Sequence, residues 1–229
     1  MDLSQAISYP FDDAEWVSKL AMTALLTFAA IALMPLLFVG LVPLCVLLGY
    51  SLEIIDAVRR KADYPMPRWT DFQGYLARGA GMLPALIVYN LPLIFGACCL
   101  TVVRASLGSA FLEGVILLAV LCCLTPLILG YILYTWPMLA NATAKYARGQ
   151  PPKVFFEVGK LTDAVNAQFG PAMQLALLFV LVNVGLTALQ LVPVIGQLLF
   201  FALYFPIMAH LIGQYARIME TKDPHRKRR

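Results

Sequence analysis

Long apolar runs separated by short polar stretches dominate this chain. They cover about residues 20–55, 82–103, 113–141, 171–191 and 195–215. The second to fifth runs are each long enough to cross a hydrocarbon core of about 30 Å, because a helix rises about 1.5 Å per residue. No stretch has the period-two alternation of a transmembrane barrel strand, and backbone groups in lipid must then pair within helices. The pattern predicts an all-α, polytopic membrane protein with five to six membrane segments.

The first run is longer than one membrane helix needs and shorter than two full spans need. Pro35, Gly40 and Pro43 lie near its middle. These residues are compatible with one long kinked helix and with a tight hairpin that enters the membrane and returns. The sequence leaves both arrangements open, and with them the side on which the N-terminus lies.

Three similar units follow one another, at roughly residues 10–62, 65–150 and 151–229. Each contains a proline-led apolar stretch that leaves through a basic segment, and the near-identical tetrapeptides KYAR (145–148) and QYAR (214–217) end two of these stretches. Proline suits the first turn of a helix, where its missing N–H costs nothing. We therefore predict a single membrane domain, residues 1–229, built from three approximate repeats.

Each unit also opens with an amphipathic stretch, at 11–20, 68–83 and 151–170. Amphipathic helices of this kind lie in the membrane interface, with aromatic side chains at headgroup depth. Each repeat is therefore expected to be an interfacial helix followed by a helical hairpin. The expected interfacial anchors are Trp16, Trp69, Phe155 and Phe156.

Composition supports the membrane assignment. Of the 229 residues, 61% are hydrophobic and only 13% are charged, whereas soluble domains carry about 25% charge. A soluble protein of this length cannot bury so much apolar surface. The formal net charge is +4, but the basic clusters follow apolar helices and are not interleaved with aromatics, so nucleic acid is not an expected partner. The expected partners are membrane lipids and other integral membrane proteins.

The basic residues predict the orientation. They follow the apolar runs and fall on one side of the predicted topology; they are Arg59, Arg60, Lys61, Lys145, Arg148 and Arg217. Lysine and arginine are retained on the cytoplasmic side of membranes. We therefore expect a cytoplasmic C-terminus. A hairpin in the first run would put the N-terminus in the cytoplasm too, whereas a single span would put it outside.

Three segments together resemble a known family. They are FDDAEWVSKL (11–20), GYSLEIIDAVRRKADYPMPRWTDF (49–72) and VPVIGQLLFFALYFPIMAHLIGQYAR (192–217). They are similar to the aromatic-acidic start, the GY…R…LP.W.D. segment and the late GQY.R helix of the prokaryotic membrane proteins of domain-of-unknown-function family 4013. Met66 and Arg68 depart from that pattern. The resemblance implies a multi-pass protein of the prokaryotic cytoplasmic (inner) membrane, and it implies no activity.

Few residues are candidates for chemistry. His210 lies within an apolar run, where a neutral imidazole suits haem or chlorophyll ligation, a hydrogen bond to a neighbouring helix, or proton handling. The five cysteines lie in apolar runs without metal-binding spacing, so we predict no metal site and no bound cofactor. Asn90, Asn183 and Gln190 are expected to form hydrogen bonds between helices.

No catalytic motif is present, so we expect a protein that is not an enzyme. The leading interpretation is a structural or accessory integral membrane subunit that binds partner membrane proteins within a larger complex. The first alternative is a small-molecule or lipid transporter, because many transporters contain internal repeats. The second is a haem or chlorophyll carrier that uses His210.

Overall fold

The computed structural model describes residues 1–36, 38–61, 66–106 and 110–221. These residues form helices joined by turns, and none of them lies in a strand. Five helices are long and apolar enough to cross a membrane: Leu41–Arg59, Phe72–Val103, Cys122–Ala147, Phe169–Leu189 and Ile195–Thr221. The predicted all-α membrane fold is therefore confirmed.

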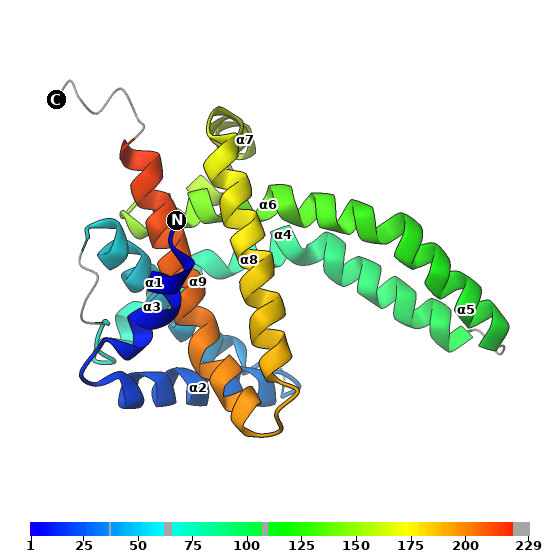
Figure 1. The fold of residues 1–229 in the computed structure, drawn as a ribbon, viewed down its shortest axis with the longest axis horizontal. Coiled ribbons are helices and arrows are strands. Elements are labelled where there is room, and N and C mark those ends of the chain that lie inside the picture. Colours follow the sequence, from blue (N-terminus) through cyan, green and yellow to red (C-terminus); the bar gives the residue numbers. More distant parts are fainter. Residues whose placement is uncertain (37, 62–65, 107–109, 222–229) are drawn as a thin grey trace.

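The helices follow one another along the chain as labelled in Figure 1. Their order is α1 (Leu3–Ser8), the 3₁₀ turn η1 (Tyr9–Phe11), α2 (Trp16–Ala32), α3 (Leu41–Arg59), α4 (Phe72–Ser106), α5 (Ala110–Ala119), the π-helical turn η2 (Val120–Leu124), α6 (Thr125–Ala147), the 3₁₀ turn η3 (Pro152–Phe156), α7 (Val158–Ala167), α8 (Phe169–Leu189) and α9 (Ile195–Thr221).

The first apolar run forms a helical hairpin. Helix α2 ends at Ala32 and α3 begins at Leu41. The turn passes so close to α2 that a side chain at Gly40 would collide with the carbonyl oxygen of Ala30, so glycine is required there. Helix α2 also meets the α1–η1 segment at a bend of 102°, and that bent pair is a sixth candidate span.

The predicted interfacial helices are only partly separate. The third stretch forms η3 and α7, but residues 72–83 of the second are the beginning of α4, a continuous helix of 35 residues. The first is divided between η1 and α2. In the second stretch the helix continues from Phe72 into the apolar run without a break, whereas in the third α7 ends at Ala167 before α8 begins. The threefold repeat therefore remains a prediction.

Helix α3 is the centre of the molecule. It packs against α4 on one side and α9 on another, and its side chains Tyr50, Ile54 and Val58 are fully buried. A β-carbon at Gly49 would collide with the backbone of Tyr75 in α4, and one at Gly213 would collide with Val58. Glycine therefore brings the three backbones close together, as it does in membrane helix pairs.

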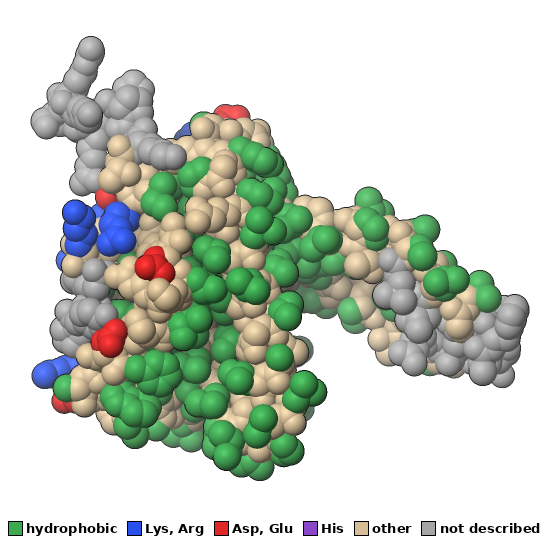
Figure 2. All heavy atoms as spheres, viewed as in Figure 1, with side chains coloured by type: hydrophobic (Ala, Val, Ile, Leu, Met, Phe, Trp, Pro, Cys, Tyr) green, Lys and Arg blue, Asp and Glu red, His purple; other side chains and the backbone are tan. Residues whose placement is uncertain are grey.

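A long helical hairpin leaves this packed body (Figure 1). We call residues 91–106 of α4 and residues 110–130 of α5, η2 and α6 the arm, and the remainder the body. At the base of the arm, the hydroxyl of Tyr131 donates to the carbonyl of Tyr89 at 2.6 Å. Among the arm side chains that the structure describes, none is buried. In Figure 2 the charged side chains that are drawn in colour lie on the body, and the coloured part of the arm surface is hydrophobic or uncharged.

Candidate functional site

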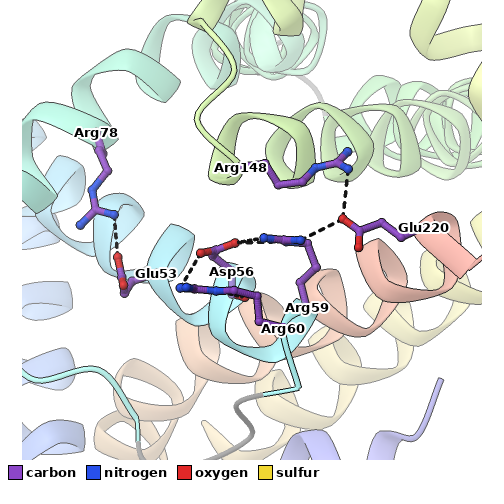
Figure 3. Close-up of polar contacts among 7 residues, drawn as sticks. All are labelled: Glu53, Asp56, Arg59, Arg60, Arg78, Arg148 and Glu220. Carbon is purple, nitrogen blue, oxygen red and sulfur yellow. Dashed lines mark hydrogen bonds and ion pairs between the residues drawn. The ribbon is translucent and has the colours of Figure 1, made fainter. Parts of the chain in front are cut away.

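An ionic network joins the C-terminal ends of three helices (Figure 3). Glu220 of α9 contacts Arg59 of α3 and Arg148 at the end of α6, each at 3.0 Å. Arg59 also pairs with Asp56 at 2.5 Å, and Asp56 binds Arg60 at 2.6 Å. The side chains of Arg59 and Glu220 are each only 15% exposed. One carboxylate therefore holds the ends of α3, α6 and α9 together.

Helix α4 contributes to the same end of the body. Arg78 binds Glu53 of α3 at 2.6 Å, beside the network in Figure 3. The seven residues of the figure comprise four guanidinium groups and three carboxylates, so the region has a small positive excess. We call this set, Glu53, Asp56, Arg59, Arg60, Arg78, Arg148 and Glu220, the charged end.

An elongated apolar cavity lies between five helices of the body. Its volume is about 340 Å³, within the range of small-molecule sites. Leu44, Leu48 and Ile55 line it along one face of α3, and Trp136 and Phe179 close it from α6 and α8. The lining is mostly hydrocarbon and aromatic.

The walls of the cavity lead to the charged end. On α3, Arg59 follows the lining residue Ile55 by one turn. On α4, Arg78 precedes the lining residue Met82 by one turn. Residues four apart lie on the same face of a helix. The apolar stripes of both helices therefore continue into arginine at the same end of the body.

A second polar cluster is buried near the start of α2. The ammonium of Lys19 contacts the carboxylate of Asp13 at 2.8 Å and the carbonyl of Met66 at 2.7 Å, while the amide of Met66 donates to Asp13 at 2.6 Å. Both charged side chains are at most 4% exposed. Burial raises the pKa of Asp13, but hydrogen bonds from Lys19, Glu15 and Met66 outweigh it and hold the pKa below its usual value.

Aromatic side chains complete this cluster. Trp69 stacks on Tyr50 with ring centroids 3.9 Å apart, and its indole N–H donates to the carbonyl of Lys19 at 3.3 Å. The hydroxyl of Tyr50 donates to Pro67, and that of Tyr75 donates to Arg68. The described part of the connection from α3 to α4 is thereby fixed against α2. Residues 66–69 therefore have a structural role that their sequence alone did not indicate.

His210 is fully buried in α9, against the N-terminal segment. Its ring lies 4.6 Å from that of Tyr9, and its Nδ1 is 3.1 Å from Nε2 of Gln214. Gln214 in turn accepts from the amide of Asp2 at 2.7 Å and donates to the Asp2 carbonyl at 2.9 Å. His210 thus lies where the N-terminus docks on α9. The described residues contain no cluster of three or more metal-ligating side chains.

Two of the four predicted interfacial anchors expose their rings. Trp16 and Phe156 are exposed, as an anchor requires. Phe155 is instead fully buried: its ring packs on Tyr146, and its carbonyl accepts from Tyr89 at 2.7 Å. Trp69 is held in the aromatic cluster. Phe155 and the half-buried Trp69 therefore pack on other aromatic rings of the protein, and the anchor role of the four residues remains a prediction.

The hydrogen bonds of Asn90 and Asn183 lie within one helix, so the interhelical contacts expected for these residues and for Gln190 remain a prediction. Asn90 and Asn183 each donate to a carbonyl one turn earlier in their own helix, at 2.8 Å, and Gln190 is exposed after the end of α8. Tyrosine and threonine form hydrogen bonds between helices. The hydroxyl of Tyr146 in α6 donates to Arg78 in α4 at 2.9 Å, and that of Thr27 in α2 donates to Phe201 in α9 at 3.1 Å.

The six basic residues predicted to share one side differ in their surroundings. Arg59, Arg60 and Arg148 belong to the charged end. Lys61 is exposed just after α3, whereas Lys145 and Arg217 are half-buried near the ends of α6 and α9. The ion pairs depend on acidic partners that the pattern of basic residues did not reveal.

The long apolar helices define a polytopic helical membrane protein. Comparison with known families matches residues 32–201, most of the chain, to the family described as protein of unknown function (DUF4013). The chain therefore belongs to this family, as its motifs indicated. The match includes the segment 49–72 but not 11–20. No curated protein and no solved structure matches the chain.

Proposed function

We propose that the protein is an accessory subunit of a membrane complex and that its arm packs against transmembrane helices of a partner integral membrane protein. One observation carries this proposal: none of the described arm side chains is buried within the chain, although the arm is strongly apolar. A membrane helix that lacks cover from its own chain faces lipid or another protein. The role requires no enzymatic activity.

The small residues of the arm favour a protein neighbour. Interfaces between membrane helices are enriched in small residues, which let the backbones approach. Gly114 and Gly130 are exposed, and a β-carbon at either would meet nothing within 4 Å. Phe95 and Leu127 are 72% and 70% exposed. A surface of bulky and small residues suits packing of side chains from one helix between those of another.

The charged end supports an orientation for the subunit. Arg59, Arg60 and Arg148 lie together with Glu220, near the end of α9, and basic residues are retained in the cytoplasm. We therefore propose a protein of the prokaryotic cytoplasmic membrane whose C-terminus is cytoplasmic. Asp2 contacts Gln214 in the same half of α9, which favours a cytoplasmic N-terminus. A Ser8→Cys variant without the native cysteines should then resist labelling from outside.

The cavity favours one alternative, a transporter of a small molecule or lipid. It is large enough for a ligand and lies between the helices of the body. Uptake of a labelled lipid across proteoliposomes measures this function. Transport by the purified chain alone would contradict an accessory role, whereas binding without transport would be compatible with it.

The main test is purification of the full chain from its native membrane in mild detergent, followed by mass spectrometry. We expect a stoichiometric assembly that contains a second membrane protein. Gly130→Leu should reduce that assembly because the larger side chain blocks a close helix contact. Gly185→Leu is the matched control, since Gly185 is an exposed α8 glycine that also has open space around it.

The outcomes are distinct. Loss of the partner from Gly130→Leu and its retention by Gly185→Leu would support docking through the arm. Equal retention in both variants would contradict docking through the arm. A lone chain or a homo-oligomer in the unaltered protein would contradict the accessory function itself.

A further inference from the structure

The shape of the cavity suits a chain-like ligand. Its α3 wall extends from Leu44 to Ile55, about 16 Å at a rise of about 1.5 Å per residue. Leu44, Leu86, Phe205 and Met208 are lining residues that remain half-exposed, so the cavity also communicates with the surroundings of the bundle. A space that extends about 16 Å along α3 and has this opening fits an extended molecule that enters from the side.

The chemistry of the wall favours an apolar ligand. Ser51, Asn90 and Thr143 line the cavity, but each donates a hydrogen bond to a carbonyl of its own helix, at 2.9, 2.8 and 2.7 Å. Most of the other lining residues are aliphatic or aromatic, with Met82 and Met208 among them. Methionine adapts its shape to flexible apolar partners. A hydrocarbon chain matches this lining.

The charged end indicates which chemical group lies at the end of this hydrocarbon chain. Arg148 forms an ion pair with Glu220 at 3.0 Å, and its side chain is 35% exposed. A guanidinium carries five N–H donors, and its planar geometry suits phosphate. The bond to Glu220 uses Nη1 of Arg148, and Glu220 is shared with Arg59, which also pairs with Asp56. This excess of donors complements an anionic headgroup.

We propose that the cavity binds one acyl chain of an anionic phospholipid of the surrounding bilayer, with its phosphate headgroup at Arg148. The second acyl chain stays in the bilayer, on the open side of the cavity. Basic pockets between membrane helices bind anionic headgroups in this way. The site belongs to the body, so the inference does not depend on docking of the arm.

Trp136 provides a direct probe because it lines the cavity. The full chain is reconstituted in nanodiscs of phosphatidylcholine that contain small fractions of either brominated phosphatidylglycerol or brominated phosphatidylcholine. Bromine quenches nearby tryptophan, and a Trp136→Phe variant identifies the part of the signal that comes from this residue. We expect quenching by the anionic lipid to saturate at a several-fold lower mole fraction. Equal quenching by the two lipids would overturn the proposal.

Two variants test the binding of the acyl chain and the binding of the headgroup independently. Ala140→Leu fills the cavity and should remove the saturable quenching, whereas Ala188→Leu, on the exposed face of α8, should not. Arg148→Gln removes one basic group and should weaken the preference for phosphatidylglycerol about fivefold. Its control is Lys160→Gln, which removes a basic group from an exposed ion pair with Glu157.

If Ala140→Leu does not fold, Arg148→Gln still tests the proposal. In Arg148→Gln, Glu220 keeps its ion pair with Arg59. An unchanged lipid preference in Arg148→Gln would overturn the headgroup assignment. Lipid analysis of the purified chain distinguishes the sources of the ligand. Co-purified phosphatidylglycerol above its share in the membrane supports the proposal, whereas a bound free fatty acid in its place contradicts it.

Discussion

The contact between α3 and α4 in the body and the helices of the arm use glycine in opposite ways. In the body, β-carbons at Gly49 and Gly79 would collide with the backbone of the neighbouring helix, so these glycines allow α3 and α4 to touch. In the arm, Gly96 and Gly130 have open space where a β-carbon would be. The same residue in similarly apolar helices therefore supports packing in one region and leaves an open surface in the other. Helices α3 and α4 of the body pack closely on each other, whereas the described arm side chains depend on lipid or another protein for their packing.

Polar groups follow the same division. The body contains the Asp13–Lys19 pair and the ionic network around Glu220, which join segments far apart in the chain. In the arm, the hydroxyls of Thr101 and Ser106 donate to carbonyls one turn earlier in their own helix. These bonds satisfy the polar groups in lipid without fixing the arm to anything. This difference predicts that added side-chain atoms will lower the folding stability at the packed contacts of the body and will not lower it in the arm.

The largest effect is expected for Asp13→Asn. The substitution leaves the buried Lys19 with only a 3.9 Å contact to the exposed carboxylate of Glu15, and breaking a buried ion pair typically costs about 3–5 kcal/mol of folding free energy. Thermal unfolding of the purified protein in detergent, followed by circular dichroism, measures the loss. Asp163→Asn is the control, because Asp163 is exposed on α7. Similar stability of the two variants would show that the buried pair does not hold α2 to the body.

The same pair gives the body a pH dependence. A carboxyl whose pKa is lowered by folding adds stability above its unfolded pKa of about 3.9, and this contribution disappears as the pH falls through the folded pKa. The native protein should therefore lose stability at the acidic end, below about pH 4. The Asp13→Asn variant should lack this component of the loss. Parallel pH profiles of the two proteins would contradict the assignment.

Gly79→Ala tests the close contact in the body. The added methyl group would collide with the carbonyl of Cys45 and the amide of Gly49. Neither backbone atom can move without separating α3 from α4, so we expect a loss of about 1–3 kcal/mol. Gly185→Ala adds the same methyl group in open space on α8 and serves as the control. Unchanged stability in Gly79→Ala would mean that the helices separate at little cost.

Glu220→Gln tests the ionic network with a smaller expected effect. The change removes the carboxylate that contacts Arg59 and Arg148, and a partly buried ionic contact of this kind contributes about 1 kcal/mol. Glu157→Gln, which breaks the exposed pair with Lys160, should cost less than about 0.5 kcal/mol. Equal losses would indicate that the network does not tie α9 to α3 and α6.

Much of the fold was predictable from the sequence. Lipid permits only helices for backbone that crosses it, so the apolar runs determined the spans. The hairpin of α2 and α3 was not decided, because proline and glycine near residue 40 fit a kink as well as a turn. The continuity of α4 was also missed, because the amphipathic stretch at 68–83, which contains Gly79, was expected to be an interfacial helix separate from the apolar run at 82–103. Gly79 is instead required by contact with α3.

The candidate sites were less predictable, for a physical reason. Hydrophobicity does not distinguish a side chain that faces lipid from one that packs on protein, so the arm and the body look alike in sequence. Arg59 and Arg148 were recognised as basic residues at helix ends, but their shared partner Glu220 is distant in sequence. Phe155 and Phe156 are adjacent, yet one is buried and the other exposed. Such differences arise only from tertiary packing.

The last prediction concerns Gly96→Ala, for which we expect a gain of folding stability instead of a loss. Gly96→Ala places a methyl group where nothing lies within 4 Å, and alanine favours a helix over glycine by about 1 kcal/mol. The isolated chain should therefore become slightly more stable, in contrast to Gly79→Ala. The measurement is the same thermal unfolding in detergent, with both variants prepared side by side. A loss of stability in Gly96→Ala would mean that the two limbs of the arm pack closely on each other, and the contrast between arm and body would then fail at this position.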